Sequence, residues 1–134
     1  MARGILDTST LILLSRIEDL EALPSEPLIT TITLAELSVG PLVADTDEER
    51  AARQVHLQLA EADFDPLPFD VAAARAFGRV AASLRGAGRK PSARAYDAMI
   101  GAVALANELP VHTCNPRDFA RIDGLDVVPV SVPA

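Results

Sequence analysis

The sequence includes Ala95-Tyr96-Asp97-Ala98-Met99-Ile100-Gly101-Ala102-Val103-Ala104, a stretch that predicts a helix with apolar residues on nearly every side. A helix of this kind is usually buried. Asp97 is the only charged residue between Arg94 and Glu108. Because a buried carboxylate is costly unless it is paired or bound to a metal ion, Asp97 predicts a partner elsewhere in the chain.

The composition predicts a single α/β domain over residues 1–134. The chain is 49% hydrophobic and long enough to enclose one core, whereas aromatic residues make up only 4%. The core is therefore expected to consist of alanine, leucine, valine and isoleucine. Alanine-rich apolar segments alternate with short β-branched runs, which is typical of a mixed α/β protein rather than of a β-sandwich.

Three features predict a soluble, cytoplasmic protein without a membrane segment. Cys114 is the single cysteine, so no intramolecular disulfide can form. Asp7 interrupts the N-terminal apolar run, so no secretory leader is predicted. The longest uncharged apolar run, residues 98–106, is far shorter than the ~18 residues that a membrane span requires.

Charge is distributed unevenly along the chain. The net charge of −7 argues mildly against indiscriminate nucleic-acid binding. Six of the 12 cations nevertheless lie in a stretch without acidic residues between Asp70 and Asp97: Arg75, Arg79, Arg85, Arg89, Lys90 and Arg94. The last four precede the Asp97 helix directly and predict a local site for a polyanionic backbone.

Short apolar or β-branched runs predict strands at residues 4–6, 28–32, 111–114 and 126–130. Residues 64–69 contain Pro66 and Pro68, so they predict at most a very short strand at a sheet edge. Helical patterns separate these runs. The sheet is therefore expected to be parallel, with helices on both of its faces.

The predicted helices are recognised by their capping residues and apolar stripes. The first ends before Pro24 and carries Leu11, Leu14, Ile17 and Leu20. The second opens with the capping box Thr33-x-x-Glu36 and ends near Gly40-Pro41. A charged amphipathic helix then starts at residues 45–47 and continues through Leu59 and Ala62.

Three further helices are predicted in the second half of the chain. Asp70 caps a helix over residues 71–84, whose inner face is expected to comprise Val71, Ala74, Phe77, Val80, Ala81 and Leu84. Ser92 can cap the helix that contains Asp97 and runs to about Glu108. Asn115 followed by Pro116 opens a last, short helix.

Acidic residues are expected to gather at one edge of the sheet. In parallel sheets, functional groups collect outside the carboxyl ends of the strands. Asp7 ends the first strand, and Glu36 lies in the first turn of the helix after the second. Asn115 and Asp118 directly follow the strand at 111–114, and Asp97 lies near the start of a helix that could project to the same edge.

Clustered carboxylates predict a divalent cation. They repel one another, and hard cations such as Mg²⁺ or Mn²⁺ relieve that repulsion because they prefer oxygen ligands. No histidine and cysteine cluster competes, since His112 is expected to be a packed histidine and Cys114 a small buried hydrophobe. A carboxylate-bound Mg²⁺ suits phosphate chemistry, because it activates water and stabilises charge on the phosphoryl group.

Each acid also has a purely structural interpretation. Asp7 can cap the first helix, Glu36 fits the capping box, and Asp118 can offset a helix dipole. Asp97 fits these alternatives least, because it is the fifth residue after the expected cap. The common placement of the acids, rather than any one of them, favours a functional site.

Four motifs occur in order along the chain: Leu6-Asp7-Thr8-Ser9, Thr33-Leu34-Ala35-Glu36-Leu37, Tyr96-Asp97-Ala98-Met99-Ile100-Gly101-Ala102 and Thr113-Cys114-Asn115-Pro116-Arg117-Asp118-Phe119. Together they resemble a PIN domain, and most closely a VapC-type toxin ribonuclease, over almost the whole length. The resemblance implies a PIN-like three-layer sandwich with a central, mostly parallel five-stranded sheet and helices on both faces. It also implies a Mg²⁺- or Mn²⁺-dependent endoribonuclease.

The resemblance implies an acidic core made of Asp7, Glu36 and Asp97. Asp7 and Asp97 would hold the metal most directly, with Glu36 as a ligand or a water-positioning base. Many relatives have Asp directly after the late strand, where this chain has Asn115. Either Asn115 or Asp118 would complete the site, with Asp118 ranked slightly ahead as the acid.

The resemblance also implies a reaction and partners. RNA would be hydrolysed in line to a 5′-phosphate and a 3′-hydroxyl, with Thr8 or Ser9 and Thr113 adding hydroxyl contacts. The protein would be the toxin of a type II toxin–antitoxin system, a homodimer neutralised by a cognate VapB-type antitoxin. The apolar helices at 8–22 and 34–62 are landing surfaces for that antitoxin.

Two other interpretations fit the sequence less well. A phosphoreceiver-type Mg²⁺ domain would need adjacent acids after the first strand and a lysine at the end of a late strand, but Lys90, the sole lysine, lies in a predicted loop. A catalytically weak or inactive PIN-like module that binds protein or RNA would keep its acids only as helix caps. The combination of Asp7, Glu36 and Asp97 argues against this module, and Asn115 argues slightly for it.

Overall fold

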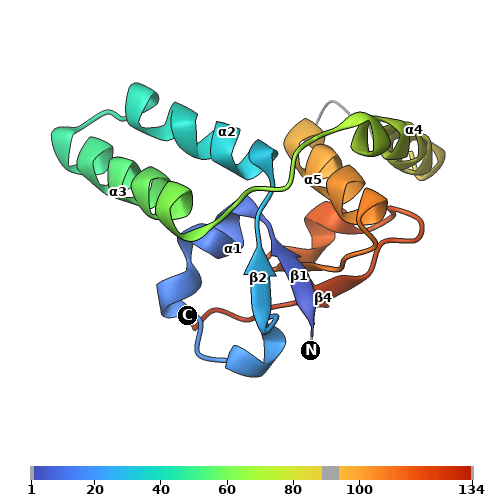
Figure 1. The fold of residues 1–134 in the computed structure, drawn as a ribbon, viewed down its shortest axis with the longest axis horizontal. Coiled ribbons are helices and arrows are strands. Elements are labelled where there is room, and N and C mark those ends of the chain that lie inside the picture. Colours follow the sequence, from blue (N-terminus) through green and yellow to red (C-terminus); the bar gives the residue numbers. More distant parts are fainter. Residues whose placement is uncertain (1, 89–93, 134) are drawn as a thin grey trace.

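The computed structural model describes residues 2–88 and 94–133, and at its centre lies a parallel sheet (Figure 1). The strands are β1 (Arg3–Leu6), β2 (Glu26–Leu28), β3 (Val111–Thr113) and β4 (Val127–Pro129), in the order β2-β1-β3-β4. In the register of the sheet, Ile5 pairs with Leu28 on one side and with Val111 on the other. β1 is therefore central, and the residues that follow it lie between the ends of β2 and β3.

Five α-helices surround the sheet within the described residues: α1 (Thr8–Ile12), α2 (Thr31–Val39), α3 (Asp47–Asp63), α4 (Val71–Gly86) and α5 (Ala95–Ala106). α2 and α3 pack side by side, and α4 packs against α5 at the other end of the molecule (Figure 1). None of the helices described is both long and apolar enough to cross a bilayer.

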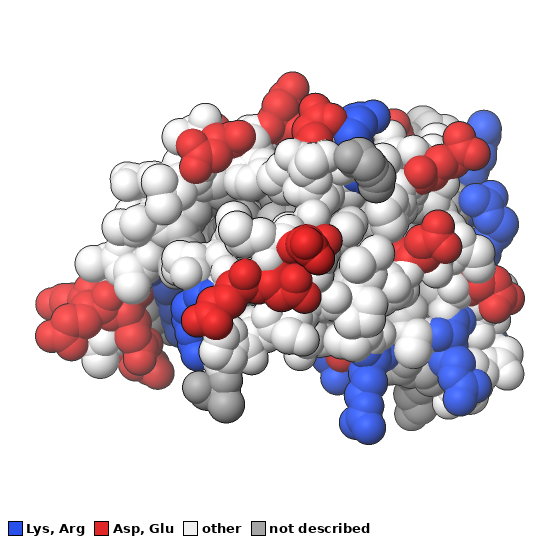
Figure 2. Space-filling model, turned by 90° about the horizontal axis from the view of Figure 1, so that it is seen from below, with Lys and Arg blue, Asp and Glu red and all other residues white. Residues whose placement is uncertain are grey.

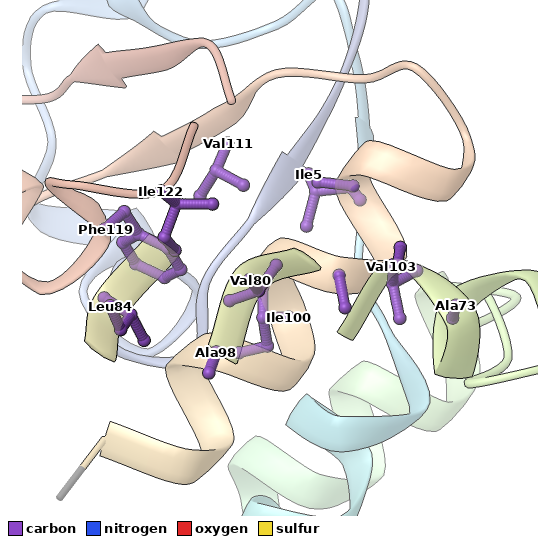
Figure 3. Packing of buried hydrophobic residues seen from close by; sticks show 13 residues of the cluster. Ile5, Ala73, Val80, Leu84, Ala98, Ile100, Val103, Val111, Phe119 and Ile122 are labelled. Carbon is purple, nitrogen blue, oxygen red and sulfur yellow. The ribbon is translucent and has the colours of Figure 1, made fainter. Parts of the chain in front are cut away.

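Two hydrophobic clusters lie on opposite faces of β1, because successive side chains of a strand point to opposite faces. Ile5 belongs to a cluster with α4 and α5 that includes Ile100 and Phe119 (Figure 3). Leu6 belongs to a second cluster with Leu37 of α2 and Ala60 of α3. The predicted α/β class, with a parallel sheet and helices on both faces, is confirmed.

The expectation of five strands is wrong for the described residues, where the sheet has four. The segment 64–69 contributes only a single bridge, in which Leu67 exchanges backbone hydrogen bonds with Ile29 and Thr31, each of 2.9 Å. Pro66 and Pro68 flank Leu67 and have no N–H to donate, so the pairing cannot extend.

The predicted cap of α4 and the predicted start of α3 are confirmed, but the predicted inner face of α4 is partly wrong. The Thr46 hydroxyl accepts from the amide of Glu49, and the Asp70 carboxylate accepts from the amide of Ala73. Val71 is 67% exposed and Ala74 is also exposed. The buried row is instead Ala73, Ala76, Val80 and Leu84, whose two alanines allow α4 to lie close against the core.

The first predicted helix is shorter than its apolar stripe. α1 ends at Ile12, and two short 3₁₀ turns follow, Leu14–Arg16 and Leu20–Ala22. Leu20 is 70% exposed, while Ile17 is buried in extended backbone. The His112 ring is hydrogen-bonded to the carbonyl of Ala22 at 2.7 Å, a contact across 90 residues that local periodicity does not contain. The prediction of a packed histidine at 112 is confirmed.

We expect Gly4→Ala to lower the free energy of unfolding by about 2 kcal/mol. A Cβ at position 4 would lie 2.5 Å from the His112 ring, which its bond to Ala22 holds in place. Gly78→Ala is the matched control: no atom lies within 4 Å of its Cβ position, so this exposed helical site should gain about 0.5–1 kcal/mol. Urea unfolding measures both, and equal stability of Gly4→Ala and the wild type would contradict the expectation.

Candidate active site

The four carboxylates Asp7, Glu36, Asp97 and Asp118 influence one another at the carboxyl edge of the sheet. The pKa of Asp97 is raised to about 6: burial has the largest effect, the negative charges of Asp118, Asp7 and Glu36 add to it, and Arg94 offsets part of the rise. Charges that perturb one another in this way are close in space. The structure thus brings together the four acids that the sequence predicted to converge.

Asp7 follows β1 directly, and its side chain is buried, with 2% exposed. Its oxygens accept hydrogen bonds from the hydroxyls of Thr10, of Thr113 at 2.9 Å and of Ser9 at 3.2 Å. Burial raises the pKa of Asp7, and these hydroxyls, with a weaker effect from the Thr10 amide, offset part of the rise. Asp7 occupies the N-cap position of α1 without forming a side-chain capping bond, so capping alone does not explain it.

Glu36 is not part of a capping box, and that interpretation is wrong. α2 begins at Thr31, and its cap is Thr30, whose hydroxyl accepts from the amide of Thr33 at 3.3 Å. Thr30 has extended backbone and is buried, and the cap lies three residues before the predicted cap Thr33. Glu36 therefore lies beyond the first turn and is free of any capping role.

A relay of hydroxyls orients Glu36. Thr8 donates to Glu36 Oε1 at 2.7 Å and lies 2.9 Å from the Thr33 hydroxyl. Because Thr8 has one hydroxyl proton and gives it to Glu36, Thr33 must donate to Thr8. Burial raises the pKa of Glu36, the bond from Thr8 lowers it, and the charge of Asp7 raises it again.

Asp97 lies in the first turn of α5, which begins at Ala95 with Arg94 at the cap position. The prediction that it lies beyond the first turn is wrong, and the predicted cap Ser92 falls outside the described residues. A helix dipole favours a charged carboxylate there by about 0.3–1 kcal/mol. The pKa of Asp97 nevertheless rises from 3.8 to about 6, opposite to the direction in which the dipole acts. Burial and neighbouring acids therefore outweigh the dipole.

Asp118 and Asn115 flank different acids. Asp118 forms an ion pair with Arg94 at 3.1 Å and is the neighbouring carboxylate with the largest effect on Asp97. Asn115 is exposed, and its side-chain amide donates to Ser9 Oγ at 2.9 Å, so it reaches Asp7 through Ser9. The two alternatives for the fourth position thus act on different acids of the same site, Asn115 on Asp7 through Ser9 and Asp118 on Asp97.

The donor set fits a hard cation that retains much of its water shell. Among residues 2–88 and 94–133, no three His, Cys, Asp or Glu side chains are arranged to hold a metal ion together. Mg²⁺ commonly uses only one or two carboxylates, with water and phosphate oxygens as its remaining ligands. The mutual repulsion of these carboxylates is what such a cation would relieve.

The other predicted residues are only partly at the site. Thr113 lies at the end of β3 and donates to Asp7, and Arg94 pairs with Asp118. Arg85 is exposed in the last turn of α4, and no contact joins it to the acids. Arg89 and Lys90 fall outside the described residues. Cys114 was expected to be buried but is half-exposed, because it lies just past β3 at the edge.

Two buried threonines at the site were not predicted as site residues. Thr10 donates to Asp7 and accepts from the amide of Cys114 at 2.9 Å, so it joins α1 to the end of β3. Thr33 was predicted as a helix cap and instead begins the relay to Glu36. The run of three hydroxyl residues after Asp7 was the available signal for Thr10.

Comparison with known proteins agrees with this geometry. The family model for the PIN domain matches residues 5–125. The chain is 41% identical to ribonuclease VapC5 of Mycobacterium tuberculosis over 125 residues, which cover 92% of this chain and 90% of that protein. It is 31% identical to ribonuclease VapC4 of the same species, over 76% of this chain and 75% of the relative.

Solved structures give the same result. The crystal structure of the VapBC-5 toxin–antitoxin system from M. tuberculosis matches with a TM-score of 0.85 and 39% identity, over 97% of this chain and 100% of the matched chain. DNA-bound VapBC from Salmonella typhimurium matches with a TM-score of 0.67 and 28% identity, over 95% and 97% of the two chains. The fold and the acidic edge thus define an α/β domain of the PIN class. The chain belongs to the PIN domain family and, within it, to the VapC group.

We expect Asp97→Asn to stabilise the folded protein by about 1–2 kcal/mol at about pH 7.5 without divalent cations. Because the pKa of Asp97 is about 6 when folded, above its unfolded value near 3.9, the folded state binds more protons than the unfolded chain between these values. The contribution of Asp97 to stability is therefore present at low pH and is lost as pH rises through this window. Asparagine has no such loss.

Urea unfolding at about pH 4.5 and pH 7.5, with EDTA and with Mg²⁺, measures the effect. The advantage of Asp97→Asn should shrink at the lower pH and on addition of Mg²⁺. Asp65→Asn, at an exposed acid outside the site, is the control for net charge. An advantage that is the same at both pH values would contradict this account.

Proposed function

We propose that this protein is a Mg²⁺- or Mn²⁺-dependent endoribonuclease and the toxin of a type II toxin–antitoxin system. The observation that carries the proposal is the mutual electrostatic effect of Asp7, Glu36 and Asp97 at the edge of a PIN domain. Relatives named ribonuclease VapC support the activity. The protein would act in the cytoplasm as a single domain that forms a homodimer.

The acidic core has distinct roles in the proposed reaction. Asp7 and Asp97 would hold the cation most directly, with Glu36 as a further ligand or as the base that positions water. When bound, Mg²⁺ or Mn²⁺ would neutralise charge on the attacked phosphate and lower the pKa of water. Three buried or half-buried carboxylates whose pKa values are raised are suited to both tasks.

Glu36 is the residue best prepared to accept the proton of the attacking water. Thr8 binds its Oε1 atom, which leaves Oε2 for the water. The water oxygen bonds to phosphorus, its proton passes to Glu36, and the bond between phosphorus and the 3′ oxygen breaks. That oxygen takes up a proton, so the products are a 3′-hydroxyl and a 5′-phosphate.

The residues around the acids would position them. Thr8 orients Glu36, and Thr113 orients Asp7. Asn115 acts on Asp7 through Ser9, whereas Asp118 acts on Asp97 and fills the fourth acidic position. Arg85 and Arg94 would bind the RNA backbone, together with Arg89 and Lys90, which fall outside the described residues.

We expect Asp97→Asn and Asp7→Asn each to lower RNA cleavage by at least about 100-fold, because each removes a carboxylate from the cation site. EDTA should abolish wild-type cleavage, and Mg²⁺ should restore it. In cells, expression of the wild type should arrest growth and create new RNA 5′ ends that map to defined positions. The variants should do neither.

Asp65→Asn is the matched control and should arrest growth as the wild type does, since its exposed side chain lies outside the acidic edge. The nuclease proposal fails if Asp97→Asn and the wild type arrest growth equally and neither creates new RNA ends. Loss of cleavage by Asp97→Asn without loss of folding distinguishes a catalytic effect from a structural one.

An apolar cavity supports the proposed antitoxin partner. A volume of ≈ 290 Å³ lies among α1, α2 and α3 and is lined mainly by apolar residues: Leu11, Ile12, Leu14, Leu37, Leu59, Ala60 and Phe64. Leu59 is 54% exposed, and Val55, one turn earlier on α3, is 51% exposed. Matches to VapBC toxin–antitoxin structures support a VapB-type antitoxin segment as the occupant.

We expect Leu59→Glu to weaken neutralisation by the cognate antitoxin at least about 10-fold while leaving RNA cleavage intact, because a charge in the cavity opposes apolar burial. Val71→Glu, at a 67% exposed position of α4, is the control and should leave neutralisation unchanged. Co-expression rescue of growth and pull-down of the antitoxin provide the measurements. Full rescue of Leu59→Glu by the antitoxin would place the antitoxin elsewhere.

A further inference from the structure

An open hollow next to the acidic edge is lined by two arginines and no acid. Its volume is ≈ 340 Å³, and its lining residues are Ala87, Arg117, Ala120 and Arg121. Ala87 follows α4, whereas the other three belong to the segment after β3. The two alanines leave room between the arginines, so a bulky anionic group could enter from solvent.

Arg121 adopts a backbone conformation that favours glycine. Its φ is 73°, in the left-handed region, where a residue with a Cβ is strained. The neighbouring residues Phe119 and Ile122 are both buried, with 1% and 6% exposed, so the turn at Arg121 lets both enter the core. Gly124, three residues later, has the same left-handed conformation, with φ of 83°. An arginine where glycine would fold better indicates a use for its side chain.

The guanidinium of Arg121 has no ion-pair partner among the described residues. It also lines a second hollow of ≈ 650 Å³ with Arg79 of α4, which likewise has no ion pair there, and with Asp123. By contrast, Arg50 and Arg53 on α3 pair with acids of the same helix. Figure 2 shows a cluster of acidic side chains at the end where α2 joins α3, whereas acidic and basic side chains are interspersed at the opposite end.

A residue that lines the hollow is next in sequence to a residue of the acidic site. Arg117 directly precedes Asp118, whose carboxylate pairs with Arg94 and acts on Asp97. A polyanion bound over four carboxylates needs cations beyond them, since the chain as a whole has a net charge of −7. Arg121, which has no ion pair among the described residues, is therefore placed where a strand that leaves the acids would pass.

We propose that Arg121 and Arg117 form a subsite for a phosphate of the RNA backbone outside the scissile bond. The subsite rests on the proposed function only in taking RNA as the ligand. Arginine binds phosphate through two parallel N–H donors, and it does so without regard to base sequence. Arg79 extends the same surface toward α4.

The test uses RNA of about 12 nucleotides with a fluorescent label, in the Asp97→Asn background so that the RNA stays intact. Arg121→Gly should weaken binding roughly 5–10-fold and lower the slope of log affinity against log salt by about 0.7. Arg121→Lys, which keeps the charge but loses the two parallel N–H donors, should bind more weakly than the parent and more tightly than Arg121→Gly. Arg50→Ala changes net charge equally at the far end and should also remain within about twofold.

Thermal stability gives a second measurement, in which Arg121→Gly should change in the opposite direction from RNA binding. Because glycine relieves the strain at φ 73°, Arg121→Gly should raise the Tm by about 2–4 °C while it weakens RNA binding. A merely structural arginine would not combine weaker binding with higher stability. If Arg121→Gly and Arg50→Ala bind RNA with the same affinity, the subsite is overturned.

The outcomes separate this subsite from the nuclease proposal. Failure of the wild type to cleave any RNA, together with weaker binding by Arg121→Gly, would leave the subsite standing and remove the nuclease. Inorganic phosphate titrated alone distinguishes a small-anion site. If phosphate raises the Tm of the wild type but not of Arg121→Gly, and RNA binding is equal in both, the RNA subsite is overturned.

Discussion

The structure depends on one buried carboxylate at the end of its central strand. Asp7 is nearly inaccessible to solvent, and the hydroxyls of Ser9, Thr10 and Thr113 satisfy its oxygens. Two of these donors come from α1 and the third from β3, so the same contacts that solvate the acid join three elements. A buried polar group must be satisfied in this way, because an unsatisfied one costs more than the bond returns.

The strand order explains why this edge becomes a site. β1 lies between β2 and β3, so the residues after it reach both neighbours. Thr8 contacts Thr33 and Glu36 of α2 on one side, while Ser9 contacts Asn115 after β3 on the other. Hydroxyl groups thus hold the acids in defined orientations from both directions. A preorganised polar network of this kind has a cost in solvation, which the surrounding core offsets.

The acids lower the stability of the folded state, so their clustering indicates a functional rather than a structural role. Burial and mutual repulsion raise the pKa of Asp7, Glu36 and Asp97, so charging these groups at neutral pH destabilises the folded state. Arg94, which also pairs with Asp118, lowers the pKa of Asp97 but does not cancel the rise. Strongly perturbed groups cluster at functional sites, and a PIN domain that retains this cluster is consistent with a cation and a phosphate ligand.

The sequence by itself determined the α/β class, the parallel sheet and the group of acids at one edge. These features follow from local patterns: short apolar strands, the cap Asp70, and the rule that parallel strands end at the same edge. Only the tertiary structure decided where α1 ends, that Thr30 rather than Thr33 caps α2, and that Asp97 lies in the first turn of α5. It also decided that residues 64–69, which their two prolines had limited to a very short edge strand, form only a single bridge. The hydroxyl network and the left-handed turn at Arg121 were equally beyond the sequence. These features depend on contacts between residues far apart in the chain, whose energies no local pattern contains.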